Sequence, residues 1–357
     1  MQVFYVRRNP YELANWWEKF FKKLGQRFKN WFYFKDTGGF FRGSLHRTCS
    51  VTESKINYLQ QQTSQSWLEE NYDALVISQE ATNPRVESDN ISSLNFLNDL
   101  ESITTVLLVD DPDPAYVPGN EVFDRFDLVF KRGPYKDTKR YELSEVNRNK
   151  IRPTMLHYRK LIPNRFNINR VDPRNYGQRK PADEFEHDVF FLGLDVGDWR
   201  RKTVQKLHQK DVEFYGGLYT SEQYEGEPPD HLTHEPLPYS EFLQAIRASR
   251  INVAAEHKGF SHRHLEIWAQ DSFMVSSPAI DEIALPFEPE EGTHFVMYES
   301  VEELDEIVDY YLNHPDERRA IAKEGRSLFE EEYDFEKHGE YIKRQITKTA
   351  DDPPVKF

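Results

Sequence analysis

Short apolar runs and helical patterns alternate along the second half of the chain, and this alternation constrains the fold more than any other feature. Runs rich in β-forming residues lie at 188–194, 212–217, 251–256, 272–277 and 294–299. The segments between them, such as "GDWRRKTVQKLHQK" and "YSEFLQAIRASR", space their apolar residues as a helix does. Parallel strands are joined by crossover helices of this kind. The pattern therefore predicts a parallel sheet covered by helices.

The first half of the chain has the same ingredients in a less regular order. Its β-forming runs lie at 2–6, 73–78, 104–111 and 126–131. Residues 152–187 carry several prolines, arginines and asparagines without periodicity, which is typical of a connection, and the polar residues 219–238, with four prolines, predict a surface loop. We expect an N-terminal α/β domain at 1–165, a linker at 166–187 and a C-terminal α/β domain at 188–333.

Length and charge narrow the classes of function. A chain of 357 residues has room for two domains with separate cores. Its formal net charge of -15 argues against nucleic acid as a partner, because phosphates would repel it. The single cysteine, Cys49, cannot form an intrachain disulfide, and no apolar run reaches the roughly 18 residues of a spanning helix. We expect a cytoplasmic protein.

Charged residues gather where the third helix of the second half begins. The stretch "KGFSHRHLEIWAQDSFMVSS" places Lys258, Arg263 and Glu266 around a predicted helix start, directly after one strand and before the next. Helix N-termini attract anions, because their first N–H groups are unpaired and the helix dipole adds positive charge. The stretch predicts an anion site; the alternative is that Glu266 only complements the dipole and pairs with Arg263.

The first strand–helix junction of the second half also combines glycines with arginines at a helix start. In "GLDVGDWRRKTVQKL" a strand ends near Gly193, Gly197 follows in a tight loop, and a helix opens with Arg200 and Arg201. Arginines at a helix start are candidates for binding an anion, and a solvated basic helix face is the alternative. The segment matches neither the dinucleotide fingerprint nor a P-loop, which argues against dehydrogenases and P-loop ATPases.

Two adjacent carboxylates end a strand in the first half. In "TTVLLVDDPDP", Asp110 and Asp111 stand at the carboxyl end of a predicted buried strand, the edge where open α/β sheets bind ligands. Either carboxylate is a candidate general base for an acceptor hydroxyl. An ordinary Asp-Pro turn that ends the strand is the alternative interpretation.

The order of strand, "KGFSHRHLE" loop, helix and "SFMVSS" strand resembles the nucleotide-binding half of GT-B glycosyltransferases, in particular the group related to the spore-maturation protein CgeB. Arg263, Leu265 and Glu266 match the signature of that group, and the likeness continues from "AIDEIALPFEPEEG" to "SLFEEEYDF". It implies the GT-B fold: two Rossmann-like domains with parallel sheets facing a central cleft. It also implies that the last helix, 334–357, crosses back to the first domain, with Phe335, Tyr341 and Ile342 as its apolar contacts.

The resemblance assigns roles to the charged residues. Glu266 would hold the ribose hydroxyls of a nucleotide sugar such as a UDP-sugar, while Gly193, Arg201, Lys258 and Arg263 would face the diphosphate. Retaining GT-B families carry another glutamate eight positions before Glu266, where this chain has Lys258, so the anomeric outcome stays open. The resemblance implies no metal and no cofactor, because basic side chains and helix dipoles stabilise the leaving diphosphate.

The function implied is transfer of a sugar from a nucleoside-diphosphate sugar to a hydroxyl of a glycan, a lipid-linked molecule or another acceptor, in the cleft between the domains. Two alternatives remain open: a GT-B nucleotide-sugar epimerase, which consumes the donor without an acceptor, and a noncatalytic protein that binds sugar nucleotides or assembles with partners.

Residues 10–34 add an unusual segment to the first half. Aromatic residues such as Trp16, Trp17 and Phe20 lie near one helical stripe, opposite lysines and arginines. A basic, aromatic amphipathic helix can lie in a membrane interface, which would make the protein peripheral to the membrane. Packing of the same stripe on a sheet is the alternative.

Overall fold

The computed structural model describes residues 1–7, 39–55, 65–79, 88–111, 113–155, 185–220, 229–256 and 259–351. Lys258, the aromatic segment 10–34 and most of the predicted linker lie outside these residues. The chain divides into two compact units. Unit 1 comprises residues 1–164, 284–286 and 334–357, and unit 2 comprises residues 165–283 and 287–333.

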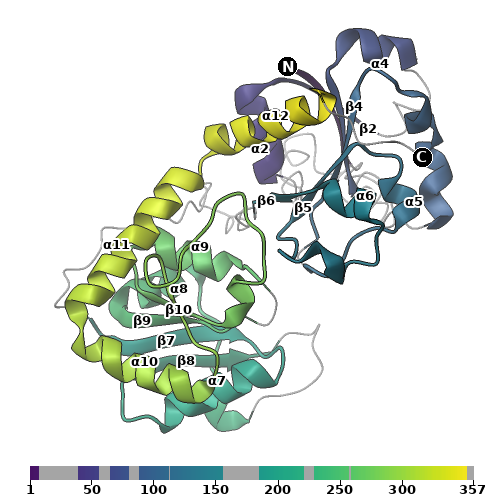
Figure 1. Cartoon of the computed structure of the whole chain (residues 1–357). Helices are drawn as coiled ribbons and strands as arrows, with labels where there is room; N and C mark the ends of the chain where they lie inside the picture. The colour runs from purple at the N-terminus through teal and green to yellow at the C-terminus, as the bar shows by residue number, and fades with distance from the viewer. Residues whose placement is uncertain are drawn as a thin grey trace, which may run out of the picture. The chain divides into compact units, whose positions relative to one another are not determined.

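Unit 1 is built on a six-stranded parallel sheet with the order β2-β1-β3-β4-β5-β6 (Figure 1). Its strands are β1 (Gln2–Arg7), β2 (Ser50–Lys55), β3 (Ala74–Ser78), β4 (Thr104–Val109), β5 (Leu128–Arg132) and β6 (Ile151–Thr154). Its helices are α2 (Gly39–Thr48), α4 (Gln65–Asn71), η5 (Ser88–Asp99), α5 (Asn120–Phe123), η6 (Thr138–Arg140), α6 (Glu145–Asn149) and α12 (Phe335–Asp351).

The central strands of unit 1 are buried on both faces. Every residue of β3 and β4 is buried, and successive side chains point to opposite faces of the sheet. Leu75 and Leu107 pack on the face covered by η5 and α5, whereas Val76 and Val106 pack with Ile342 on the other face. Helices α2 and α12 cover this second face side by side (Figure 1). The last helix of the chain therefore completes the core of the first unit.

Unit 2 is built on a five-stranded parallel sheet with the order β11-β10-β9-β7-β8. Its strands are β7 (His187–Leu194), β8 (Phe214–Tyr219), β9 (Ser249–Ala254), β10 (Met274–Ser276) and β11 (Val296–Met297). Its helices are α7 (Asp198–Gln209), η8 (Asp230–Leu232), α8 (Tyr239–Ala248), α9 (His262–Ala269), η9 (Pro278–Ile280), α10 (Val301–Asn313) and α11 (Pro315–Glu332).

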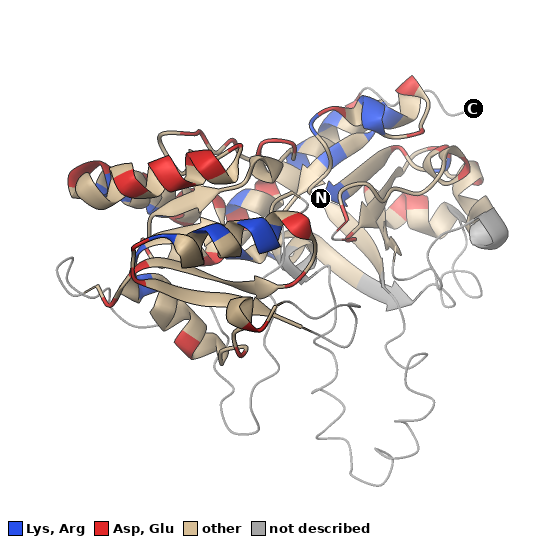
Figure 2. Ribbon diagram, turned by 90° about the horizontal axis from the view of Figure 1, so that it is seen from below, with Lys and Arg blue, Asp and Glu red and all other residues tan. Residues whose placement is uncertain are grey.

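Charge follows this layering. Figure 2 shows Lys, Arg, Asp and Glu mainly on helices and loops, while the described strands carry few of them. This is the pattern expected when helices separate a parallel sheet from water. Within the described ranges, no helix has the length and apolar character needed to cross a membrane.

Three details of the sequence-based predictions were wrong. The segment 219–238 is not wholly a surface loop, because Leu232 is buried and the His234 N–H donates to the Leu218 carbonyl at 2.8 Å. The segment 152–187 is not wholly a connection, because β6 reaches Thr154 and β7 begins at His187, within the predicted linker. Phe335 is 37% exposed and does not anchor α12, whose buried side chains include His338, Ile342 and Ile346.

Candidate functional site

The sheet of unit 2 reverses its strand order around β7. From β7 the chain runs to β8 on one side and then returns to β9 on the other side. The carboxyl ends of β7 and β9 are therefore a topological switch point, where open α/β sheets form their ligand-binding crevice. Helices α7 and α9 both begin at this edge, because each directly follows one of these two strands.

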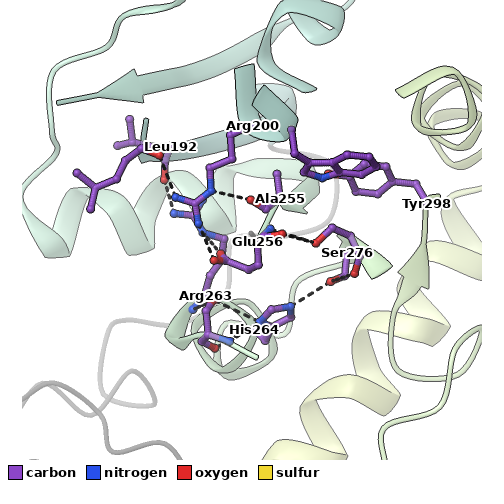
Figure 3. Close-up of polar contacts among 12 residues, drawn as sticks. Leu192, Arg200, Ala255, Glu256, Arg263, His264, Ser276 and Tyr298 are labelled. Atoms are coloured by element: carbon purple, nitrogen blue, oxygen red, sulfur yellow. Dashed lines mark hydrogen bonds and ion pairs between the residues drawn. The ribbon is translucent and has the colours of Figure 1, made fainter. Parts of the chain in front are cut away.

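A buried cluster of two arginines and one glutamate occupies this switch point (Figure 3). Arg200 lies in the first turn of α7, Glu256 follows β9, and Arg263 lies in the first turn of α9. The Arg200 Nη2 donates to Glu256 Oε2 at 2.6 Å, and Arg263 Nε lies 3.6 Å from Glu256 Oε1. All three side chains are at most 13% exposed. One carboxylate thus faces two guanidinium groups, and the cluster keeps a positive charge.

The two guanidinium groups also bind carbonyl groups at the ends of the strands. Arg200 donates to the Ala255 carbonyl at 2.7 Å and to the Leu194 carbonyl at 2.9 Å. Arg263 donates to the Leu192 carbonyl and lies over the ring of Phe191, 4.9 Å from its centroid. These bonds fix both arginines at the sheet edge and leave little freedom to their side chains.

Burial and charge act against each other in the cluster. Burial alone would raise the pKa of the Glu256 carboxyl, but the Arg200 and Arg263 guanidiniums outweigh it and lower this pKa. Burial lowers the pKa of Arg263 despite the opposing effect of Glu256. The cluster is an ionised network in a poorly solvated place, where an added anion would interact strongly with the remaining positive charge.

The N-terminus of α9 is held by a capping box. The Ser261 Oγ accepts the Arg263 N–H at 3.2 Å, and His264 Nδ1 accepts the Ser261 N–H at 3.0 Å. His264 Nε2 therefore carries the proton and donates to Ser276 Oγ at 3.0 Å, which ties α9 to β10. Burial lowers the pKa of His264 to about 4, so this histidine is neutral at pH 7.

The other residues predicted for this site take different positions. Arg201 pairs with Asp195 at 2.6 Å, and its side chain is 38% exposed, so it lies beside the buried cluster and not within it. A Cβ on Gly193 would lie 2.9 Å from Phe191 Cζ and 3.6 Å from Arg200 Nη1, so glycine leaves room for both side chains. Gly197 caps α7 with a φ of 114°, which glycine adopts without strain.

Glu266 lies on α9 one turn after Arg263 and is half-buried. Its carboxylate raises the pKa of Arg263, although burial and Arg200 act in the other direction. The structure thus places Glu266 beside the arginine cluster. Lys258 belongs to the loop between Glu256 and α9 but lies outside the described residues.

The carboxyl edge of the unit 1 sheet holds a second charged cluster. Asp110, directly after β4, forms an ion pair with Arg132 at 3.2 Å, and both side chains are buried. Asp111 accepts the Asp113 N–H at 2.8 Å through its carboxylate. Lys131 is fully buried, and its Nζ donates to the Asp111 carbonyl at 2.8 Å and to the Arg132 carbonyl at 2.7 Å. These contacts tie Asp110 and the Asp111 backbone to the end of β5.

Burial dominates the ionisation of Lys131. It lowers the pKa of the Lys131 amine to about 7, with a further lowering by Arg132, while the nearby aspartates act in the opposite direction. A neutral amine has two N–H groups, and two carbonyl oxygens accept them here. This cluster lies one strand away from the β1–β3 switch point of the sheet. Within the described ranges, no group of three or more His, Cys, Asp or Glu side chains is placed to hold a metal ion.

The sequence analysis missed Arg200 and Glu256 as partners. They lie 56 positions apart, and only the pairing of β7 with β9 brings them together. A usable signal was present, because Glu256 is a charged residue directly after the apolar run "INVAA". A carboxylate at the carboxyl end of a buried strand faces the ligand-binding edge, as Asp110 does in the first half.

Comparisons with known proteins agree with this architecture. The family described as "Glycosyl transferase-like" matches residues 200–344, which include all but the first two residues of α7, the arginine cluster and α9. A glycosyltransferase from Rickettsia africae has a similar structure, with a TM-score of 0.52 and 10% identity over 98% of this chain and 99% of the other. Alr3699/HepE from Anabaena, solved in complex with UDP, gives a TM-score of 0.51 and 12% identity over 98% of this chain and 100% of the other.

The chain has the GT-B fold. Its two parallel-sheet α/β domains match those of the GT-B glycosyltransferase structures over nearly the whole length of both chains. The expected fold class is thereby confirmed. A search of curated proteins finds no match to the sequence.

Proposed function

We propose that this GT-B protein is a glycosyltransferase that moves a sugar from a nucleoside-diphosphate sugar to an acceptor hydroxyl. The observation that carries the proposal is the buried Arg200–Glu256–Arg263 cluster at the switch point of unit 2. It lies within the segment that matches the glycosyltransferase-like family. A UDP-sugar is the first donor to test, because HepE was solved with UDP and with UDP-glucose.

The cluster suits a diphosphate leaving group. Breaking the bond between sugar and phosphate develops negative charge on the phosphate oxygen, and fixed cations stabilise that charge without reorganisation. Arg200 and Arg263 supply the buried charge, and the partly exposed Arg201 adds to it at the edge of the cluster. Lys258 remains a predicted contact of the diphosphate. The half-buried carboxylate of Glu266 would accept hydrogen bonds from the ribose hydroxyls. In this proposal, arginines and the α9 N-terminus replace a metal ion, as in the CgeB-like group.

The acceptor would bind to unit 1 near the Asp-Asp-Pro loop. The Asp110 carboxylate is buried and balances the charge of the buried Arg132 guanidinium. We therefore assign the general base to Asp111, whose half-buried carboxylate accepts a backbone N–H at one oxygen. This base is needed if the reaction inverts the anomeric centre. Membrane contact through residues 10–34 and a cytoplasmic location remain predictions.

Calorimetry with UDP, GDP, ADP, dTDP and UMP tests the donor site. We expect a nucleoside diphosphate to bind and UMP to bind at least tenfold more weakly, because it lacks the second phosphate. Glu266→Ala should weaken diphosphate binding by roughly 1.5 to 3 kcal/mol, the range for a hydrogen bond to a charged group. Lys202→Gln, which removes an exposed charge on α7, is the control. If none of the four diphosphates binds, the proposal is wrong.

Turnover separates the proposed function from its alternatives. A transferase releases the nucleoside diphosphate from the matching donor faster when an acceptor is added. An epimerase would change the donor with no acceptor present. Adding EDTA should leave the rate unchanged, and a loss of activity would show that a metal ion takes part.

A further inference from the structure

An arginine-lined pocket lies at the opposite edge of the unit 2 sheet. Four arginines line it: Arg247 at the end of α8, Arg250 in β9, and Arg318 and Arg319 near the start of α11. The strands are parallel, and residues at the amino ends of β7, β9 and β10 complete the wall. The pocket is therefore separate from the switch-point cluster, which lies at the carboxyl edge.

Positive charge dominates the wall of this pocket. Asp271 is the acidic residue among its lining side chains. Two further carboxylates stand beside it, Asp188 in an ion pair with Arg250 and Asp316 in an ion pair with Arg319 at 2.9 Å. The Asp316 side chain is 94% exposed, so water screens its attraction to Arg319. The exposed pairing of Arg319 leaves much of its charge available to a ligand in the pocket.

The fold gathers these charges against opposing physical effects. Arg318 and Arg319 lie near the N-terminus of the 18-residue helix α11, where the helix dipole disfavours cations. Arg318 is buried and donates to the Tyr311 carbonyl at 2.5 Å. Burial also lowers the pKa of the Arg247 guanidinium. An anion in the pocket would offset each of these unfavourable terms.

Other contacts hold the guanidiniums in place. The Phe185 ring lies 6.0 Å from the Arg250 Cζ and 5.8 Å from the Arg318 Cζ, measured from the ring centroid. The Arg319 Nε is buried and makes no hydrogen bond within the described part of the chain. Guanidiniums fixed in this way can bind the oxygens of a phosphate through paired hydrogen bonds.

We propose that this pocket binds a phosphate group. The hollow itself has a volume of only about 10 Å³, so a phosphate would sit at its open mouth, against the guanidiniums that line it. The phosphate belongs either to a free or small phosphorylated molecule or to the headgroup of phosphatidic acid. The site goes beyond the proposed function, because it takes no part in binding the donor.

Titration calorimetry with potassium phosphate, against potassium chloride of equal ionic strength, tests the free source. Arg247→Gln and Arg319→Gln should each weaken phosphate binding at least tenfold, whereas Lys323→Gln, an exposed charge on the same helix, should leave it unchanged. Arg247→Lys keeps the charge without the paired donors and should give an intermediate loss. Unchanged circular dichroism and melting temperature in chloride establish that the variants are folded.

Cosedimentation with vesicles tests the lipid source. Vesicles that contain phosphatidic acid should sediment the wild-type protein and not the two glutamine variants, and phosphatidylcholine vesicles should sediment none of them. The proposal is supported if the protein binds free phosphate or phosphatidic acid vesicles and if this binding depends on Arg247 and Arg319. The proposal is overturned if neither source binds, if Lys323→Gln weakens binding equally, or if only Arg263→Lys abolishes it, because phosphate would then occupy the switch point.

Discussion

The two sheets of this protein carry ionic clusters at their carboxyl edges, and the clusters differ in how their charges balance. In unit 2, one carboxylate, Glu256, lies between Arg200 and Arg263. In unit 1, Asp110 and Asp111 stand beside Arg132 and a lysine, Lys131, whose pKa is lowered to about 7. The first cluster keeps an excess of positive charge, and the second does not.

This difference teaches that the edge of a parallel sheet specifies where a ligand binds but not which one. In both units the ligand-binding edge is the one where the parallel strands end and the crossover helices begin. The residues placed after each strand then select the chemistry. Guanidiniums with one shared carboxylate suit a diphosphate, whereas adjacent aspartates beside a lysine with a lowered pKa suit the acceptance of a proton from a hydroxyl group.

The largest effect should follow from removing the carboxylate of the first cluster. Glu256→Gln leaves two buried guanidiniums without their counter-charge, and we expect it to lower the free energy of unfolding by roughly 3 to 5 kcal/mol. Urea denaturation measures this change. Glu330→Gln, which breaks the exposed pair with Arg326, is the matched control and should change little. A loss as small as that of the control would mean that Glu256 is not needed to balance the arginines.

Lys131 in the second cluster should make the free energy of unfolding depend on pH between about 7 and 10.5. The folded pKa of Lys131, about 7, lies below its ordinary value of 10.5, so between these pH values the unfolded chain binds more protons. Stability should therefore rise with pH across this window, by up to about 1.4 kcal/mol per unit. Lys131→Met, compared with the wild type by denaturation at pH 7 to 10, should remove this rise. Parallel curves for the two proteins would show that Lys131 does not titrate as described.

Among the described residues, each unit has a buried histidine, which should make both units sensitive to acid. Burial lowers the pKa of His264 in unit 2 to about 4 and that of His338 in unit 1 to about 3. Below pH 6.5 the unfolded chain takes up protons that the folded histidines do not, so stability falls by up to about 1.4 kcal/mol per pH unit for each histidine. His338→Gln should flatten the acid dependence of unit 1 alone, as judged by thermal unfolding between pH 7 and 4.5. An unchanged slope in this variant would contradict the prediction.

The smallest effect on stability should come from the arginine beside the first cluster. Arg201 pairs with Asp195 on a partly exposed surface, and this hydrogen bond raises the pKa of its guanidinium. Arg201→Gln should leave the melting temperature unchanged while weakening nucleoside-diphosphate binding. Arg200→Gln should reduce both, because Arg200 is buried and bonded to Glu256. Equal losses of melting temperature in the two variants would remove the distinction between a buried and a peripheral arginine.

Local patterns predicted most of the sheet in unit 2, because apolar strands and helical spacing alternate there without interruption. The same reasoning missed β2, whose sequence "SVTESK" is mostly polar, and β6, which contains Pro153. Both are edge strands, and an edge strand can carry polar residues or a proline because one side of it makes no ladder bonds. Sequence rules that look for the apolar pattern of central strands therefore fail to predict β2 and β6.

The site was predictable only where its residues lie close together in the chain. Arg263 and Glu266 share the first two turns of α9, and Asp110 ends a strand that the pattern identifies. The preference for Arg201 over Arg200 came from sequence alone, where neighbouring helix positions cannot be told apart. The structure distinguishes them, because α7 turns Arg200 toward the strand ends and Arg201 toward Asp195.

The packing of α12 in unit 1 has a consequence for the order in which the protein can be made. During synthesis the strands of unit 1 leave the ribosome first, but one face of their sheet is completed by Ile342 and Ile346, after all of unit 2. The main apolar cluster of unit 2 lies within residues 189–322 of the described chain, so it is synthesised before α12. The domain that is translated first is therefore the one that finishes folding last, and one face of its sheet is covered by α2 alone while the second domain forms.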